Sequence, residues 1–304
     1  MDFGTVTLRP LTSGDAPVAE RLSDDAFLAV AEAARQADDP PAARRGDDGS
    51  ARWTARTRHL VDTDPDGCWA AEMDGELVGF ATSLRRESLW CLGSFAVRPG
   101  LQGHGIGRRL LAAVEEHGRG CTHAMLCASP DPAAVRSYHR AGFHLHPRMQ
   151  LTGRVEASRL PAVGAGVVHV GDHGDRDWMD DLDRELRGGA HGTDHAVLSA
   201  EAVLLVHRDR AGYVYASGRR VDLLAARDET SARSLLVEVL GGAACAGPTS
   251  GPEAPPAELL HVTSENQWAV DVGLSAGLGL GSRGYLAVRG LAVPAPYLPH
   301  GVLL

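Results

Sequence analysis

The sequence predicts an α/β (α+β) protein with a mixed central sheet, built from two similar halves. Short apolar runs alternate with amphipathic helical patterns along the chain, which is typical of packed strands and helices. A glycine-rich turn follows one apolar strand and leads directly into a helix. The order of elements in the second half repeats that of the first. With 304 residues the chain is long enough for two domains, which we expect at 1–153 and 154–304.

The first half is predicted to run strand, two helices, three strands, helix, strand, helix, strand. Asp15 is a suitable cap for the first helix, and Asp74-Gly75 is a strong hairpin signal. Residues 36–51 are rich in Asp, Pro, Gly and Arg and predict a mobile loop. Helices are expected at 16–35, 53–61, 106–118 and 130–140, and strands at 5–10, 68–73, 77–84, 89–97, 124–128 and 143–151.

The second half follows a Gly-, Pro- and Ala-rich linker at 154–166 and shows the same order in a degenerate form. One spacing makes the repeat concrete, because Asp131 precedes Gly142 by the same number of residues as Asn266 precedes Gly277. A further loop is expected at 241–257. Helices are expected at 175–186, 231–240 and 266–276, and strands at 167–170, 203–207, 212–217, 221–226, 258–263 and from 278 onward.

The stretch from Phe95 to Leu111 predicts a phosphate-binding turn. Gly103, Gly105 and Gly107 free the backbone N–H groups to face an anion, and the following helix adds its positive N-terminal end. A P-loop would need a Gly-Lys-Ser/Thr ending, and the chain contains no lysine. A dinucleotide fold would need Gly-x-Gly-x-x-Gly after the first strand, with an acidic residue about 20 positions later, and this stretch does not fit.

Two motifs resemble those of the GNAT-type N-acetyltransferases. From Val97 to Gly107 the chain reads Val-x-Pro-x-x-Gln-x-x-Gly-x-Gly, which is similar to the acetyl-coenzyme A loop of that family. Residues 131–143 resemble the family pattern Asn-x-x-Ala-x-x-x-Tyr-x-x-x-Gly-Phe, with Tyr138 in place and Asp131 where Asn is common. The resemblance covers about residues 5–153. Together with the repeat, it implies two tandem GNAT-like domains.

The resemblance also implies acetyl-coenzyme A as co-substrate. The pyrophosphate would contact the backbone N–H groups of 102–108, and the pantetheine arm would pair with the edge of 95–97, as an added strand does. A backbone N–H near Val97 would face the thioester oxygen. The expected coenzyme-binding residues are Phe95, Ala96, Val97, Gln102, Gly103, His104, Gly105, Ile106, Gly107, Arg108 and Asp131.

In this comparison Tyr138 is the general acid for the departing thiolate. An ammonium group with a pKa of about 10 must lose a proton before it attacks, so a base is also required. Many family members place a glutamate on the strand before the loop, but residues 89–97 contain no carboxylate. Glu72, Glu87 or a chain of water molecules are the alternatives.

The second half lacks these features. Gly273 stands at the position of Tyr138, and Asp228 and Glu229 begin the helix that would hold a pyrophosphate. We expect this half to complete a substrate cleft or a dimer interface without binding coenzyme A. His191, Asp194 and His195 form its densest polar cluster. They could bind a metal, line the substrate site or cap a helix, and we expect no metal.

Composition narrows the function classes. The net charge of −9 without a basic block argues against nucleic acid and favours a cationic substrate. The sequence contains no apolar run of membrane-spanning length and no visible signal peptide, and its five scattered cysteines are typical of reduced thiols. We expect a cytoplasmic homodimer with no membrane partner.

The predicted activity is acetyl transfer to a primary amine, most simply of a small molecule. The two-domain architecture is similar to that of antibiotic-inactivating family members, including bleomycin-type acetyltransferases, which suggests antibiotic resistance. A peptide or protein amine, a longer acyl chain, and an acyl-coenzyme A sensor without turnover are alternatives. Only the last is favoured by the missing carboxylate.

Overall fold

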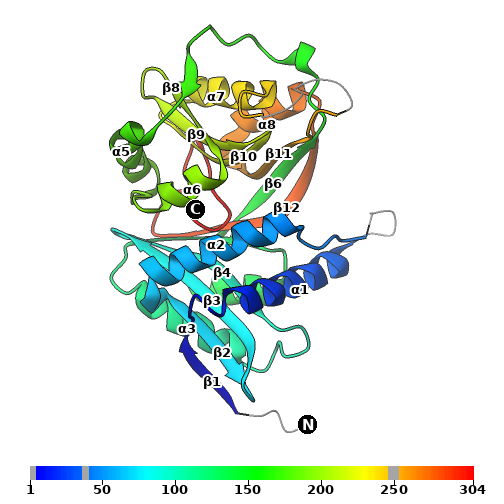
Figure 1. The fold of residues 1–304 in the computed structure, drawn as a ribbon, viewed down its shortest axis with the longest axis vertical. Coiled ribbons are helices and arrows are strands. Elements are labelled where there is room, and N and C mark those ends of the chain that lie inside the picture. Colours follow the sequence, from blue (N-terminus) through cyan, green and yellow to red (C-terminus); the bar gives the residue numbers. More distant parts are fainter. Residues whose placement is uncertain (1–4, 36–40, 246–252) are drawn as a thin grey trace.

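The computed structural model describes residues 5–35, 41–245 and 253–304 (Figure 1). The strands are β1 (Val6–Pro10), β2 (Cys68–Met73), β3 (Glu76–Arg86), β4 (Leu89–Val97), β5 (His123–Ala128), β6 (His144–Gly153), β7 (Val168–Val170), β8 (Val203–His207), β9 (Gly212–Ser217), β10 (Arg220–Ala226), β11 (Ala257–Thr263), β12 (Gly279–Arg289) and β13 (Tyr297–Leu298). The helices are α1 (Ala16–Ala34), α2 (Asp47–Thr63), α3 (Ile106–His117), α4 (Pro132–Arg140), α5 (Arg176–Arg187), α6 (Asp194–Glu201), α7 (Glu229–Gly241) and α8 (Gln267–Ser275).

All described strands belong to one mixed sheet that runs through both halves. Its order is β1-β2-β3-β4-β5-β12-β6-β11-β10-β9-β8-β7, with β13 paired to β10. The neighbours β4 and β5 are parallel, as are β10 and β11, and the remaining pairs are antiparallel. The prediction of a mixed central sheet is therefore confirmed. The two halves lie side by side along the sheet, with α1 and α2 in front of the first half (Figure 1).

The two halves exchange their last strands at the centre of the sheet. The strand β12, from the second half, lies between β5 and β6. In turn β6, from the first half, lies between β12 and β11. Each half is thus completed by a strand of the other. The expected boundary after Gly153 coincides with the end of β6, although the hydrogen bonds of β6 go to second-half strands.

The largest buried cluster also joins the halves. Leu84 and Met125 from the first half share it with Tyr213, Tyr297 and Leu303 from the second. Burial of side chains of this size contributes roughly 1.5–3 kcal/mol each. Separation of the halves would expose this cluster, so the halves form one packed body.

Most predicted elements are present, with two local corrections. The hairpin at Asp74-Gly75 is confirmed, because both residues have positive φ angles, 54° and 80°. The expected loop through residue 51 is wrong at its end, since α2 begins at Asp47; residues 36–40 and 246–252 of the two expected loops lie outside the described residues. The helix α6 was not expected. Among the described residues, no helix is long and apolar enough to cross a membrane.

Candidate functional site

The strands β4 and β5 diverge halfway along β4. Their parallel pairing covers only Leu89–Leu92, opposite His123–Leu126. A bulge at Gly93 interrupts the ladder to β3 at the same point, between the pairs formed by Ser94 and Leu92. From Gly93 to Val97, the side of β4 that faces β5 therefore has no strand partner among the described residues. An extended ligand can add its own hydrogen bonds along such an edge.

The glycine loop leads from this open edge into α3. Gly103 and Gly105 have φ angles of 83° and 84°, which favour glycine, and a Cβ at either would meet nothing within 4 Å. Gly107 serves packing instead, because a Cβ there would lie 3.3 Å from Phe95 Cζ. Gln102 Nε2 donates to the Val97 carbonyl at 3.3 Å and ties the loop to β4.

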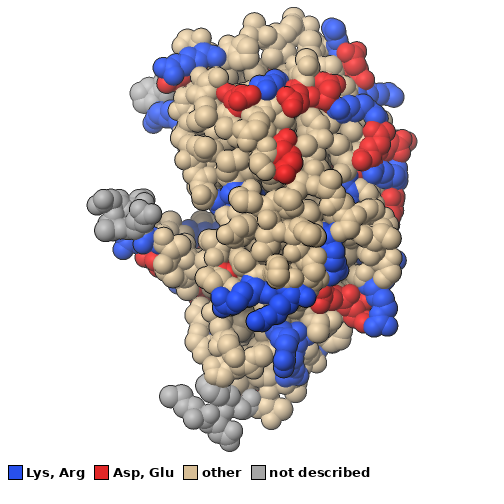
Figure 2. All heavy atoms as spheres, turned by 180° about the vertical axis from the view of Figure 1, so that it is seen from behind, with Lys and Arg blue, Asp and Glu red and all other residues tan. Residues whose placement is uncertain are grey.

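The N-terminus of α3 has no side-chain cap. The first N–H groups of a helix need acceptors, and an anion with full access to the loop can supply them. Arg108 and His104 are exposed beside this end, and Ile106 is buried beneath it. Basic side chains also gather on the first half in the view from behind, away from α1 and α2 (Figure 2). The loop therefore has the features of an anion-binding site.

Tyr138 lies on α4, in the apolar cluster that also contains Val97 and Ile106. It is 5% exposed, and its ring packs edge-on to Phe143 at 6.5 Å. Its hydroxyl has no hydrogen-bond partner among the described residues. Burial and the nearby Asp131 carboxylate raise the pKa of Tyr138, so the hydroxyl keeps its proton at neutral pH, as a general acid must.

Two further predicted coenzyme residues have roles within the chain. Asp131 Oδ1 accepts from the Ala133 N–H at 2.9 Å and caps α4, a role that the sequence interpretation missed. Ala96 faces the opposite side of β4 from Val97, since it belongs to the cluster shared with α1 and α2. The remaining coenzyme residues lie together along β4, the loop and the start of α3.

The structure does not bring the two predicted carboxylate bases to the open edge. Glu72 lies on β2, separated from β4 by β3, and it accepts from Arg9 Nε at 2.8 Å. Glu87 occupies the turn between β3 and β4, at the end of β4 far from Gly93, and it pairs with Arg184 of α5 at 2.8 Å. An open pocket of about 420 Å³ lies beside Glu87 and is lined by Arg86, Arg184 and Thr193 among others. It is distant from the glycine loop along β4.

The corresponding region of the second half is occupied by the chain itself. There β10 and β11 are parallel only at Arg220–Val221, so they diverge as β4 and β5 do. The edge of β10 that follows is paired with β13. At the start of α7, Asp228 Oδ1 accepts from the Ser231 N–H at 2.8 Å. The two features that are open in the first half, the strand edge and the helix start, are filled here by backbone and a carboxylate.

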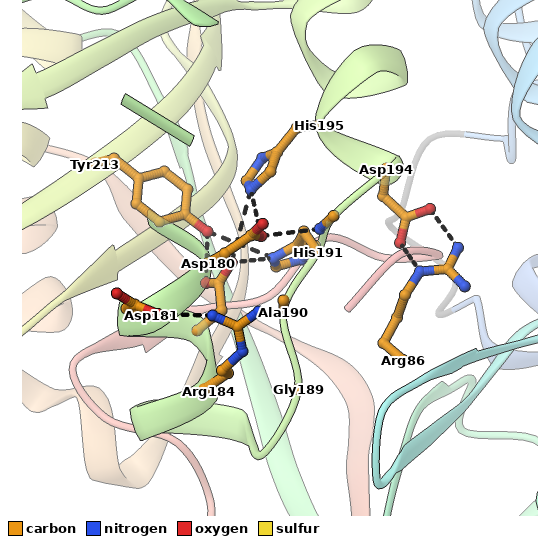
Figure 3. Close-up of polar contacts among 12 residues, drawn as sticks. Arg86, Asp180, Asp181, Arg184, Gly189, Ala190, His191, Asp194, His195 and Tyr213 are labelled. Carbon is orange, nitrogen blue, oxygen red and sulfur yellow. Dashed lines mark hydrogen bonds and ion pairs between the residues drawn. The ribbon is translucent and has the colours of Figure 1, made fainter. Parts of the chain in front are cut away.

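The expected polar cluster of the second half splits into two groups (Figure 3). Asp194, which is fully buried, faces the first half, where it accepts from Arg86 Nη2 at 2.6 Å and Nε at 2.8 Å. Its Oδ1 also lies 2.8 Å from His59 Nε2. Burial by itself raises the pKa of Asp194, but the hydrogen bonds from His59 and Arg86 outweigh it and hold this pKa well below the usual range. Asp194 thus joins the two halves.

His191 and His195 face inward with Asp183, and all three are fully buried. Their ligand atoms lie within 4.8 Å of one another, so the group has the composition of a metal site. However, Arg187 Nη1 lies 2.7 Å from His191 Nε2, and a guanidinium can only donate. His191 therefore carries its proton on Nδ1 and donates to Asp183 at 2.7 Å. In this state Nδ1 offers no lone pair to a metal.

Other side chains of the protein form hydrogen bonds with Asp183 and His195, the other two members of this cluster. Tyr213 donates to Asp183 Oδ1 at 2.6 Å, and His195 contacts Tyr215 and Asp180 at 3.1 and 3.2 Å. Burial and the Arg187 charge lower the pKa of His191, which keeps the ring neutral. The contacts of His191, His195 and Asp183 thus form a buried hydrogen-bonded network within the protein.

The strand order and the glycine loop of the first half agree with the GNAT-like fold expected from the sequence. Residues 29–143 match the model of the Acetyltransferase (GNAT) family. This part of the chain is therefore similar to the GNAT acetyltransferase family.

Curated relatives are similar over a limited segment. The mycothiol acetyltransferase of Streptomyces avermitilis is 40% identical over 88 residues, which are 27% of this chain and 29% of that protein. The mycothiol acetyltransferase of Streptomyces coelicolor is 41% identical over 91 residues, 27% of this chain and 28% of its own length. The alignment therefore spans less than a third of either relative.

Solved structures are similar over the whole chain. A protein of Pyrococcus horikoshii superposes with a TM-score of 0.73 at 16% identity, covering 100% of this chain and 96% of that one. A tandem GNAT protein from the clavulanic acid biosynthesis pathway superposes with a TM-score of 0.54 at 18% identity, covering 95% and 99%. At these identities the likeness shows the fold, and it confirms the expected tandem GNAT-like architecture.

Proposed function

We propose that the protein transfers the acetyl group of acetyl-coenzyme A to a primary amine of a small molecule. One observation carries the proposal. In the first half, the unpartnered edge of β4 and the uncapped start of α3 form a continuous path for an extended, phosphate-bearing ligand. The second half has the same fold with both positions occupied, so we assign coenzyme binding to residues 1–153 and cleft formation to residues 154–304.

The chemistry follows from this placement. The amine attacks the thioester carbonyl, a C–N bond forms, and the C–S bond breaks. The departing thiolate takes the proton of Tyr138, whose buried hydroxyl is protonated. A backbone N–H near Val97 stabilises the oxygen that gains negative charge. Because Glu72 and Glu87 lie in ion pairs away from the open edge of β4, water in the cleft is our preferred path for the amine proton.

The acceptor is proposed as a small molecule on the name of the curated relatives, mycothiol acetyltransferase. Residues of both halves meet at Gly93 of β4, where a Cβ would lie 3.2 Å from Val302 Cγ1 and 3.3 Å from Leu60 Cδ1, which suits a ligand held between the halves. An antibiotic amine is one member of this class, and a screen of amine-bearing antibiotics, amino sugars and polyamines for thiol release tests it.

Isothermal titration with acetyl-coenzyme A tests binding. We expect the wild type to bind, and a double variant Gly105→Ala, Gly107→Ala to bind at least tenfold more weakly, because Ala at φ 84° distorts the loop. Gly241→Ala is the matched control, since a Cβ there meets nothing within 4 Å. Equal binding by the wild type and the double variant would refute the loop assignment.

Turnover is tested with Tyr138→Phe. We expect kcat to fall by about 10²- to 10⁴-fold while the affinity for acetyl-coenzyme A is unchanged. An unchanged kcat would remove the acid role from Tyr138. Tight coenzyme binding by the wild type without turnover of any amine would favour the non-catalytic sensor, the alternative suggested by the missing carboxylate on β4.

A further inference from the structure

A concentration of positive charge lies where β5 ends, beside the diverging strands. Arg148 of β6 donates from Nη2 to the Ala128 carbonyl at 3.3 Å and to the Arg283 carbonyl at 3.0 Å. Arg283 occupies the bulge of β12, between Ser282 and Tyr285. The Arg148 guanidinium thus contacts the backbone of Arg283, on a strand from the other half of the chain.

Neither arginine forms an ion pair with a carboxylate in the described part of the chain. Arg148 is only 5% exposed, and its other partner is His261 Nδ1, at 2.5 Å from Nη1. Its Nε is buried without any hydrogen-bond partner in residues 5–35, 41–245 and 253–304. Arg283 Nη1 donates to the neutral amide oxygen of Gln150 at 2.9 Å.

One acidic group offsets part of this charge without forming an ion pair. Glu258 acts on Arg283 through space, and no ion pair joins Glu258 to either arginine among the described residues. Arg283 is accessible to solvent, yet the surrounding protein and the Arg148 charge lower its pKa.

His261 adds a third donor. Burial and the charges of Arg148 and Arg283 lower its pKa well below the usual value, so the ring is neutral. Because Arg148 donates to Nδ1, the ring proton is on Nε2, which is then a donor. His261 is partly accessible, as is Cys127, whose Sγ lies 4.0 Å from Nδ1.

The cluster is connected to the open edge of β4. A Cβ placed on Gly301 would lie 3.0 Å from His261 Nε2, and one placed on Gly93 would lie 3.2 Å from Val302 Cγ1. The short segment 301–302 therefore touches the donors at one end and the β4 bulge at the other. In the view from behind, the surface is hollowed at the left between the two halves, and basic side chains lie inside the hollow (Figure 2).

A buried charge without a counter-ion is costly, and a bound anion removes that cost. We propose that Arg148 and Arg283 bind an anionic group, a carboxylate or a phosphate, carried by the amine acceptor. This inference rests on the proposed function, whose acceptor it defines as an amine with an acidic group nearby. The net charge of −9 suggested a cationic substrate. The local charge at Arg148 and Arg283 is positive instead, and it attracts an anion.

The test measures anion binding on the intact protein with coenzyme A present in excess, so that the phosphate loop is occupied. Inorganic phosphate and acetate are titrated separately while thermal unfolding is followed, which distinguishes the two anion types. We expect one of them to raise the Tm of the wild type and to bind Arg283→Gln about 10- to 100-fold more weakly. Arg233→Gln is the matched control, because Arg233 is an exposed arginine paired with Asp271 on the far helices.

A second arm uses acceptor pairs, β-alanine against β-alaninamide and phosphoethanolamine against ethanolamine, with thiol release as readout. We expect Arg283→Gln to raise KM for the acidic member of a pair and to leave its neutral partner unchanged. Anion binding that is absent, or equal in the wild type and Arg283→Gln, overturns the inference. Failure of the proposed function is seen separately, as a wild type that does not bind acetyl-coenzyme A.

Discussion

Replacement of Asp194 by Asn tests whether one buried carboxylate holds the two halves together. Asp194 is fully buried on α6 and accepts two hydrogen bonds from Arg86, at 2.6 and 2.8 Å. Arg86 also contacts Asp64 at 3.0 Å, so the substitution leaves a buried guanidinium with one carboxylate in place of two. Asn keeps the shape of the side chain but removes its charge.

Loss of one partner of a buried ion pair costs about 3–5 kcal/mol. Unfolding entropy is about 2.1 cal/mol/K per residue, which for 304 residues gives about 0.6 kcal/mol/K. The expected fall in Tm for Asp194→Asn is therefore about 5–8 °C near neutral pH. Asp271→Asn is the matched control: its ion pair with Arg233 is exposed, so a loss of at most about 1 kcal/mol is expected, a shift below about 2 °C.

The pH dependence of the free energy of unfolding provides an independent test of the Asp194 ion pair. Because the folded pKa of Asp194 lies below its unfolded value, its contribution is fully present above about pH 4 and is lost as the pH falls through the folded pKa. Calorimetry of the wild type and Asp194→Asn at pH 7 and pH 3 should show the Tm difference shrinking in acid. A shift no larger than that of Asp271→Asn at pH 7 would refute the reasoning.

Three further predictions concern other parts of the molecule. Gly273→Ala should lower the free energy of unfolding by roughly 1–3 kcal/mol, because its Cβ would lie 2.7 Å from Leu151 Cδ2; Gly241→Ala, in open space, should not. Glu72→Gln should leave the acid limb of the pH–rate profile unchanged, since Glu72 is paired with Arg9 and is separated from β4 by β3. A shift of this limb to another pH would instead identify Glu72 as the base. Hydrogen bonds from Arg9 lower the pKa of Asp15 to about 2, so its stabilisation should be present above about pH 4 and decline toward pH 2 in denaturant unfolding, with a weaker decline in Asp15→Asn.

Local signals were sufficient for most elements. The Asp74-Gly75 turn, the glycine loop at 103–107 and the bounds of β2 and β4 agree with the structure because a few neighbouring residues determine each of them. The start of α2 was missed because Asp, Gly and Arg between 42 and 52 give a loop composition. Tertiary contacts stabilise the helix in this segment, since Trp53 and Leu60 are buried and Arg45 pairs with Glu20 of α1.

The sequence by itself predicted the likeness to the GNAT family, the repeat, and which half carries the glycine loop, because these depend on residue types at short, regular spacings. The tertiary structure alone decided three things: the exchange of β6 and β12, the pairing of β13 with the edge of β10, and the contact of Arg148 with the Arg283 backbone. These strand pairings and side-chain contacts join residues more than seventy positions apart. No periodicity along the chain encodes such contacts, since they follow from how the elements pack.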